Sequence, residues 1–268
     1  MNITIAGGCF PVQHNIPKGR LYHDTFRRML LERELDTNLT IVRYERFSTC
    51  LGKIEASNRT TPADLLIFHL RTEPAMRLCK LYYKYVDSSR ILRHSLNLPV
   101  FNIINPERYE IPTSRIVLPQ AGSKVSESGA HHFLREANYF LGAAVGNWKF
   151  AVDSYMKLLD DVVGYCRKKS VRLLVVGPVS RPLSRLENRL SMDIHEAFNA
   201  RAKKSGTPYL NILGMRDGSG NYLFLENGIH VNQAGHDWIG RLIFEKLVYE
   251  LLPGIGGKIA PGKNGMSR

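Results

Sequence analysis

The first residues that could do chemistry lie directly after a short apolar run at the start of the chain. Ile3 to Ala6 are followed by Gly7, Gly8 and Cys9. Glycine permits tight turns with positive φ and lets a substrate approach the main chain. A cysteine placed there would lie near exposed amide N–H groups and a helix N-terminus, which lower the thiol pKa and favour the nucleophilic thiolate. Free cysteine is also a common core residue, so a buried and inert thiol is the alternative.

A second group of polar residues lies near the other end of the chain. The stretch ENGIHVNQAGH places Asn227 three residues before His230, with Asn232 and Gly235 following. Histidine is the side chain that most readily exchanges protons near neutral pH. This stretch therefore contains the partner to consider for Cys9.

Alternating strands and helices would position both groups. We expect helices at residues 21–35, 147–170, 191–206 and 232–252, and strands at residues 2–7, 38–47, 63–70, 171–180 and 207–212. Strands that alternate with helices predict a three-layer α/β/α fold, a parallel sheet of about five strands with helices on both faces. Residues 48–53 are expected to form a turn, 90–104 a helix end and a further short strand, 106–128 a surface excursion and 253–268 a disordered tail.

The predicted sheet brings distant residues to one edge. In parallel sheets of this kind, ligands bind beyond the carboxyl ends of the strands. This rule puts Cys9, the turn around Gly52 and the segment after Leu70 at the same edge.

Composition limits the class of protein. The chain has 268 residues, of which 44% are hydrophobic and 23% charged, typical of one globular domain, which we place at residues 1–252. No apolar run is long enough for a membrane span, and no basic segment followed by an apolar one opens the chain. Four cysteines without a C-x-x-C pair favour reduced thiols in a cytoplasmic protein, with no metal site and no cofactor expected.

The net charge of +13 has two interpretations. Basic residues are scattered in pairs such as Arg27-Arg28 and Lys203-Lys204, and no nucleic-acid recognition module is present. Such pairs are usually solvated helix faces. The alternative is attraction of an anionic substrate or carrier, such as a CoA thioester, an acyl carrier protein or an acidic sugar.

The stretch from Asn227 to His236 resembles the D-G-x-H-P-N-x-x-G-H block of the SGNH (GDSL) hydrolases, which are esterases and acyltransferases on a flavodoxin-like sheet. The order of elements fits that family from Ile3 to about Leu252. The first block of the family is G-D-S with a serine nucleophile. Here Gly7, Gly8 and Cys9 are closer to the G-S-C-F form of cysteine-bearing relatives.

The resemblance implies roles for further residues. The family holds the reacting oxyanion with a glycine amide from its second block, for which Gly52 is the best match, and Gly8 belongs to the same substrate-binding region. Its third block is G-x-N-D, and here Arg71 stands at the glycine and Glu73 at the asparagine. In the last block Asn227 replaces the aspartate, while His230 is retained.

Two interpretations of this pattern remain open. In the first, Cys9 attacks an ester or thioester carbonyl, His230 transfers the proton, Asn227 orients the ring, and the amides of Cys9 and Gly52 hold the oxyanion. A thiolate and an imidazolium pair unaided, so the change from serine to cysteine is consistent with the change from aspartate to asparagine. In the second, the fold is retained without catalysis, as a binding or scaffold protein.

Two residues near the third block need separate treatment. A carboxylate at Glu73 would oppose a developing oxyanion unless it is protonated, paired with Arg71 or used to activate an acceptor. His69 could line the same edge, although a histidine at a strand end is more often structural. The sequence does not choose between hydrolysis and transfer, and it does not indicate the acyl group, the acceptor or the oligomeric state.

Overall fold

Five parallel strands form the central sheet of the protein. A computed structural model of the chain describes residues 1–8, 11, 16–44, 47–70, 82–86, 92–96, 147–180, 185–225 and 230–252, with single positions between 133 and 144. The strand order is β2-β1-β3-β6-β7. The strands are β1 (Asn2–Gly7), β2 (Asn38–Arg43), β3 (Leu65–His69), β6 (Arg172–Val176) and β7 (Tyr209–Leu210). The predicted parallel sheet is confirmed.

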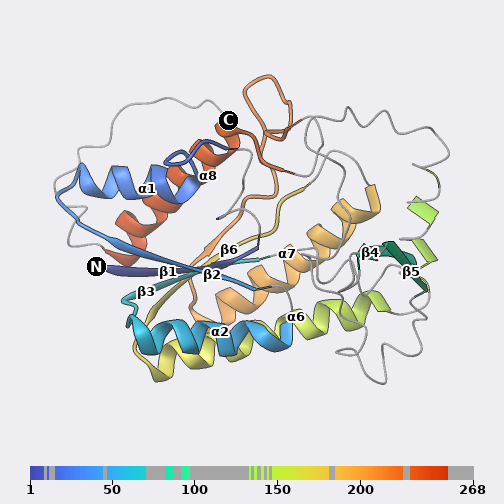
Figure 1. The fold of residues 1–268 in the computed structure, drawn as a ribbon, viewed down its shortest axis with the longest axis horizontal. Helices are drawn as coiled ribbons and strands as arrows, with labels where there is room; N and C mark the ends of the chain where they lie inside the picture. The colour runs from blue at the N-terminus through green and yellow to red at the C-terminus, as the bar shows by residue number, and fades with distance from the viewer. Residues whose placement is uncertain are drawn as a thin grey trace.

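Helices cover both faces of this sheet (Figure 1). One face carries α1 (Tyr22–Leu31) and α8 (Gln233–Lys246), which continues as the π-helical turn η4 (Leu247–Leu251). The other carries α2 (Phe47–Thr60), α6 (Asn147–Lys168) and α7 (Arg185–Ser205). The predicted three-layer α/β/α architecture is therefore confirmed. None of the described helices is long and apolar enough to cross a bilayer.

The sequence of β3 explains why it lies inside the sheet. All of its residues are buried, as expected for a parallel strand covered on both faces. Successive side chains point to opposite faces, so Leu66 and Phe68 pack with α2, α6 and α7. Leu65 and Ile67 pack with α1 and α8 instead. We call these two regions the α2/α6/α7 core and the α1/α8 core.

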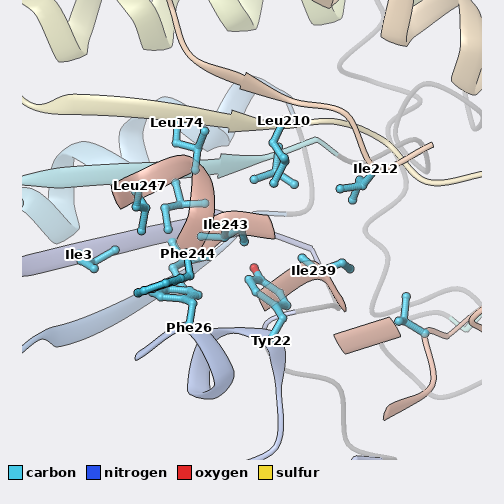
Figure 2. Close-up of a cluster of buried hydrophobic side chains, with 14 of the residues drawn as sticks. Ile3, Tyr22, Phe26, Leu174, Leu210, Ile212, Ile239, Ile243, Phe244 and Leu247 are labelled. Carbon is cyan, nitrogen blue, oxygen red and sulfur yellow. The ribbon is translucent and has the colours of Figure 1, made fainter. Parts of the chain in front are cut away.

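The α1/α8 core joins the two ends of the chain (Figure 2). Tyr22 and Phe26 of α1 meet apolar side chains of α8 and of the sheet, which are Ile3, Leu174, Leu210, Ile239, Ile243 and Phe244. The helix α1, which follows β1, and α8, which lies far along the described residues, therefore lie side by side on the sheet.

The turn predicted at residues 48–53 is wrong, because these residues belong to α2. Phe47, Cys50, Leu51 and Ile54 all contact the α2/α6/α7 core. Their spacing of three and four residues is that of one helix face. Gly52 lies on the exposed side of this helix, where one glycine costs about 1 kcal/mol and does not prevent helix formation.

The region between β3 and α6 differs from the prediction as well. β4 (Tyr82–Val86) and β5 (Leu92–Leu96) form an antiparallel pair, in which Tyr82 is opposite Leu96. A helix end and a further short strand were predicted within residues 90–104. The described part of that range, Leu92–Leu96, is the strand β5. The excursion at residues 106–128 and the tail at 253–268 lie outside the described residues.

Candidate functional site

The end of β1 is the first component of the candidate site. Gly7 and Gly8 are buried. A Cβ placed on Gly7 would lie 3.2 Å from Cγ of Pro11 and 3.4 Å from Cβ of His69. Glycine therefore allows the chain beyond β1 and the end of β3 to pack closely around this point.

The segment that leaves β1 is fixed on its far side as well. Nε2 of His23 lies 3.0 Å from the carbonyl oxygen of Pro11, to which it donates a hydrogen bond. His23 is in the first turn of α1 and is buried. Gly8 and Pro11, which flank Cys9 in the sequence, are thus both held against the core.

His69 occupies the end of β3. Its side chain is 2% exposed and its backbone pairs with Val176 of β6. The ring lies edge-on to Tyr22, with 5.8 Å between the centroids. Its carbonyl oxygen accepts a hydrogen bond of 3.2 Å from the hydroxyl of Tyr44. His69 is therefore part of the packed core at the carboxyl end of β3.

A second buried histidine links α1 to α8. The backbone N–H of Tyr22 donates to Nδ1 of His236 over 3.2 Å, and the two rings stack with centroids 6.1 Å apart. Burial lowers the pKa of His236 to about 4, and the charge of nearby His23 acts in the same direction. At neutral pH the ring is uncharged and carries its proton on Nε2, since Nδ1 is an acceptor. Sequence reasoning assigned His236 no role, although it ends the recognised block.

Asn232 and Gly235 each have a structural role at the start of α8. Asn232 caps α8, because its side-chain oxygen accepts from the N–H of Gly235 over 2.9 Å. Its Nδ2 donates to the carbonyl oxygen of Phe224 over 3.3 Å. A Cβ on Gly235 would lie 2.3 Å from Cγ1 of Val231, so only glycine fits. The start of α8 is therefore fixed to the segment before it.

His230 lies in a loop whose two ends are joined. Its carbonyl oxygen accepts from the N–H of Leu225 over 2.8 Å, and Phe224 bridges to Val231. The backbone N–H of Asn232 also donates to the carbonyl oxygen of Leu223 over 3.1 Å. The His230 side chain is half-buried. These bonds hold His230 two residues before the N-cap of α8.

A series of contacts connects Gly8 and His230 to the same edge of the sheet. Gly7 adjoins His69, His69 contacts Tyr22, and Tyr22 binds His236 in the first turn of α8. The start of α8 therefore lies beside the carboxyl ends of β1 and β3, and His230 is three residues before that helix.

Several predicted site residues lie outside the described residues, namely Cys9, Arg71, Glu73 and Asn227. Gly52 is described, but it does not lie in a free turn. It is the sixth residue of α2, where a helical N–H bonds to the carbonyl four residues earlier. We therefore assign no oxyanion contact to Gly52. Within the described ranges, no group of three or more His, Cys, Asp or Glu side chains could hold a metal ion.

Comparison with known proteins places this geometry in context. No protein-family model matches the chain, and no curated protein matches its sequence. Solved structures do match. A lipolytic protein of the G-D-S-L family from Desulfitobacterium hafniense aligns over 92% of this chain and 99% of its own, with a TM-score of 0.54 and 8% identity.

Two further solved structures also align with most of this chain. The lipase/acylhydrolase from Enterococcus faecalis aligns over 92% of this chain and 94% of its own, with a TM-score of 0.53 and 8% identity. The psychrotrophic esterase EstA from Pseudoalteromonas sp. aligns over 93% and 98%, with a TM-score of 0.51 and 11% identity. At these identities the likeness concerns the fold, and the chain has the α/β fold of the SGNH (GDSL) hydrolases.

Proposed function

We propose that this protein is an acyl-processing enzyme that uses Cys9 as nucleophile and His230 as proton carrier on an ester or thioester. The observation that supports the proposal is the series of contacts that brings the end of β1 and the start of α8 together. Gly8, which directly precedes Cys9, follows the last residue of β1, and His230 lies three residues before α8, whose first turn contacts Tyr22 through His236. Ligand sites of parallel sheets lie at the carboxyl ends of the strands.

The proposed reaction has two steps. The Cys9 thiolate attacks the carbonyl carbon, a C–S bond forms, and the bond to the alkoxide or thiolate leaving group breaks. The His230 imidazolium gives its proton to that leaving group. Water or an acceptor then attacks the acyl-enzyme and loses a proton to His230, which frees Cys9. Asn227 would orient the imidazole, because its position is three residues from His230 in a loop with joined ends.

The oxyanion must be held by donors other than Gly52. The backbone amide of Cys9 is the natural first donor, because it follows the buried end of β1. We propose that Arg71 and Glu73, which follow β3 at this edge, pair with each other. Such a pair would prevent the carboxylate of Glu73 from opposing the developing charge.

The choice of acyl chemistry is supported by the names of the structural neighbours. They include an esterase and a lipase/acylhydrolase, and those names describe those proteins. A small or carrier-bound acyl donor fits the net charge of +13 if the donor is anionic. Hydrolysis and transfer share the first step, so one experiment addresses both.

The proposal is tested by intact mass spectrometry. The wild type and Cys9→Ala are incubated with a panel of acyl thioesters and activated esters. We expect a mass increase of one acyl group on the wild type and none on Cys9→Ala. Turnover by Cys9→Ala should fall by at least roughly a thousandfold, since the covalent route is removed.

Cys166→Ala is the matched control. Cys166 is 2% exposed, and burial raises the pKa of its thiol to about 12, so its removal should leave the adduct unchanged. His230→Asn should slow adduct formation while the fold is retained. A wild type that forms no adduct, or a Cys9→Ala variant with full turnover, would favour the non-catalytic binding protein instead.

A further inference from the structure

A polar groove runs along the outer side of the α1/α8 pair. Its hollow has a volume of ≈ 260 Å³, and the basic residues at its walls are Arg20, Arg28 and Arg241. Thr25, Glu32 and Asp237 also line it. The three arginines come from the loop before α1, from α1 and from α8, and all three are exposed. They therefore converge on one hollow from three segments.

Arg20 is held in place by its backbone. Its N–H donates to the carbonyl oxygen of Pro17 over 3.2 Å, closing a turn in which Gly19 has a φ of 80°. A positive φ at this position is typical of a type II turn and requires glycine. The carbonyl oxygen of Arg20 accepts from Nε2 of Gln233 over 2.9 Å. The turn is thus fixed to the first residue of α8.

The floor of the groove is rigid as well. A Cβ on Gly240 would lie 2.7 Å from the carbonyl oxygen of Tyr22, so α1 and α8 are in close contact directly beside Arg241. Oδ1 of Asp237 accepts from the hydroxyl of Thr25 and from Nε2 of Gln233, each over 3.1 Å. Asp237 therefore joins the helices through neutral donors.

The arginines of the groove differ from other basic residues on the surface. Arg201 pairs with Asp160, Arg189 with Asp193, and Lys246 with Glu250. Within the part of the chain that the structure describes, no hydrogen bond or ion pair joins the side chain of Arg20, Arg28 or Arg241 to a carboxylate. Their donors remain available to a ligand.

We propose that this groove binds a phosphate group, free or as the phosphorylated end of a larger molecule. Guanidinium groups match the geometry of phosphate oxygens with paired donors. The hollow of ≈ 260 Å³ is smaller than the roughly 300–1,000 Å³ of drug-sized ligand sites. It therefore suits one or two phosphates and not a whole nucleotide. The site lies outside the acyl chemistry proposed for Cys9 and is tested by binding alone.

Calorimetric titration of the full chain tests this site with inorganic phosphate, pyrophosphate and glycerol 3-phosphate. We expect saturable binding, tightest for pyrophosphate, that weakens with added salt. Arg28→Gln/Arg241→Gln should weaken it by roughly tenfold or more, because it removes two of the charge-assisted donors. Tighter binding of glycerol 3-phosphate would identify a phosphorylated organic molecule as the source.

Arg27→Gln/Arg189→Gln is the matched control, since it removes the same charge from exposed positions that do not line the groove. It should leave the affinity within about twofold. Equal weakening by both double variants would show a general field effect and overturn the proposal. So would the lack of saturable binding at about 10 mM ligand. If the double variant does not fold, the single variant Arg241→Gln gives the same comparison.

Discussion

The two cores on either side of the sheet differ in the kinds of side chain that they bury. The α2/α6/α7 core is apolar, and it contains the buried thiols of Cys50 and Cys166. The α1/α8 side holds the buried histidines of the described residues, which are His23, His69 and His236. Buried imidazoles cost free energy unless they are bonded and uncharged. These buried histidines lie on the α1/α8 side, where both helices begin near the candidate site.

The helical glycines also differ between the two sides of the sheet. On α8, Gly235 and Gly240 leave no space for a Cβ. On α2 and α6, a Cβ on Gly52 or Gly164 would meet no atom within 4 Å. Close contact on the α1/α8 side fixes the start of α8, and with it the loop of His230.

The largest contrast between the faces should be in the pH dependence of stability. Burial lowers the pKa of His236 from 6.5 to about 4, so the unfolded state binds the proton more tightly. The stability that comes from the buried, neutral His236 is complete above pH 6.5, and it is lost as the pH falls toward 4. At about 1.4 kcal/mol per unit, this loss amounts to about 3 kcal/mol. Urea denaturation at a series of pH values measures it.

His236→Gln should remove most of this pH dependence. His195 on α7 is the comparison, because it is half-buried and burial lowers its pKa too. His195→Gln should change the slope of stability against pH by less than His236→Gln does. Identical slopes of stability against pH for the two variants would contradict the difference described between the two sides of the sheet.

Glycine substitutions should give the second contrast. A Cβ on Gly240 would lie 2.7 Å from both the carbonyl oxygen of Tyr22 and Cβ of Thr25. Gly240→Ala should therefore destabilise the protein by about 2 kcal/mol. Gly164→Ala on α6 should instead stabilise it by up to about 1 kcal/mol, because alanine is the better helix former. Thermal denaturation of the two variants decides this, and equal signs would contradict the packing described.

The smallest effect concerns a buried hydrogen bond at the end of β3. The Tyr44 hydroxyl donates to the carbonyl oxygen of His69 and lies 3.1 Å from the hydroxyl of Tyr155. Tyr44→Phe should cost about 1 kcal/mol in the free energy of unfolding. Tyr249→Phe, at a side chain that is 61% exposed, should cost nothing measurable. Equal stability of both variants would show that this bond contributes nothing.

The sequence predicted the sheet better than it predicted the site. β3 and β6 are continuous apolar runs, a local signal that predicts buried parallel strands, and both were found. Gly52 led to the incorrect turn prediction at residues 48–53, because glycine is frequent in turns. The helical spacing of Phe47, Cys50 and Ile54 was the available signal. Tertiary packing outweighed the low helix propensity of one glycine.

Long-range packing explains what sequence reasoning could not find. His69 was considered either as structural or as lining the edge of the site, and His236 received no role. Their burial depends on Tyr22, which lies 214 positions from His236 in sequence, and no local pattern encodes that contact. Asn232 and Gly235 were recognised as a motif. Their capping and close-packing roles become clear only from their contacts with Phe224 and Val231.

The proposed function requires His230 to lie close enough to Cys9 to favour its thiolate. Time-resolved alkylation by iodoacetamide, followed by peptide mass spectrometry, measures each cysteine in one experiment. Cys9 should react at least roughly a hundredfold faster than Cys50 and Cys166, which are both buried. His230→Asn should remove most of that advantage. Labelling of Cys9 no faster than the two buried thiols would contradict the account.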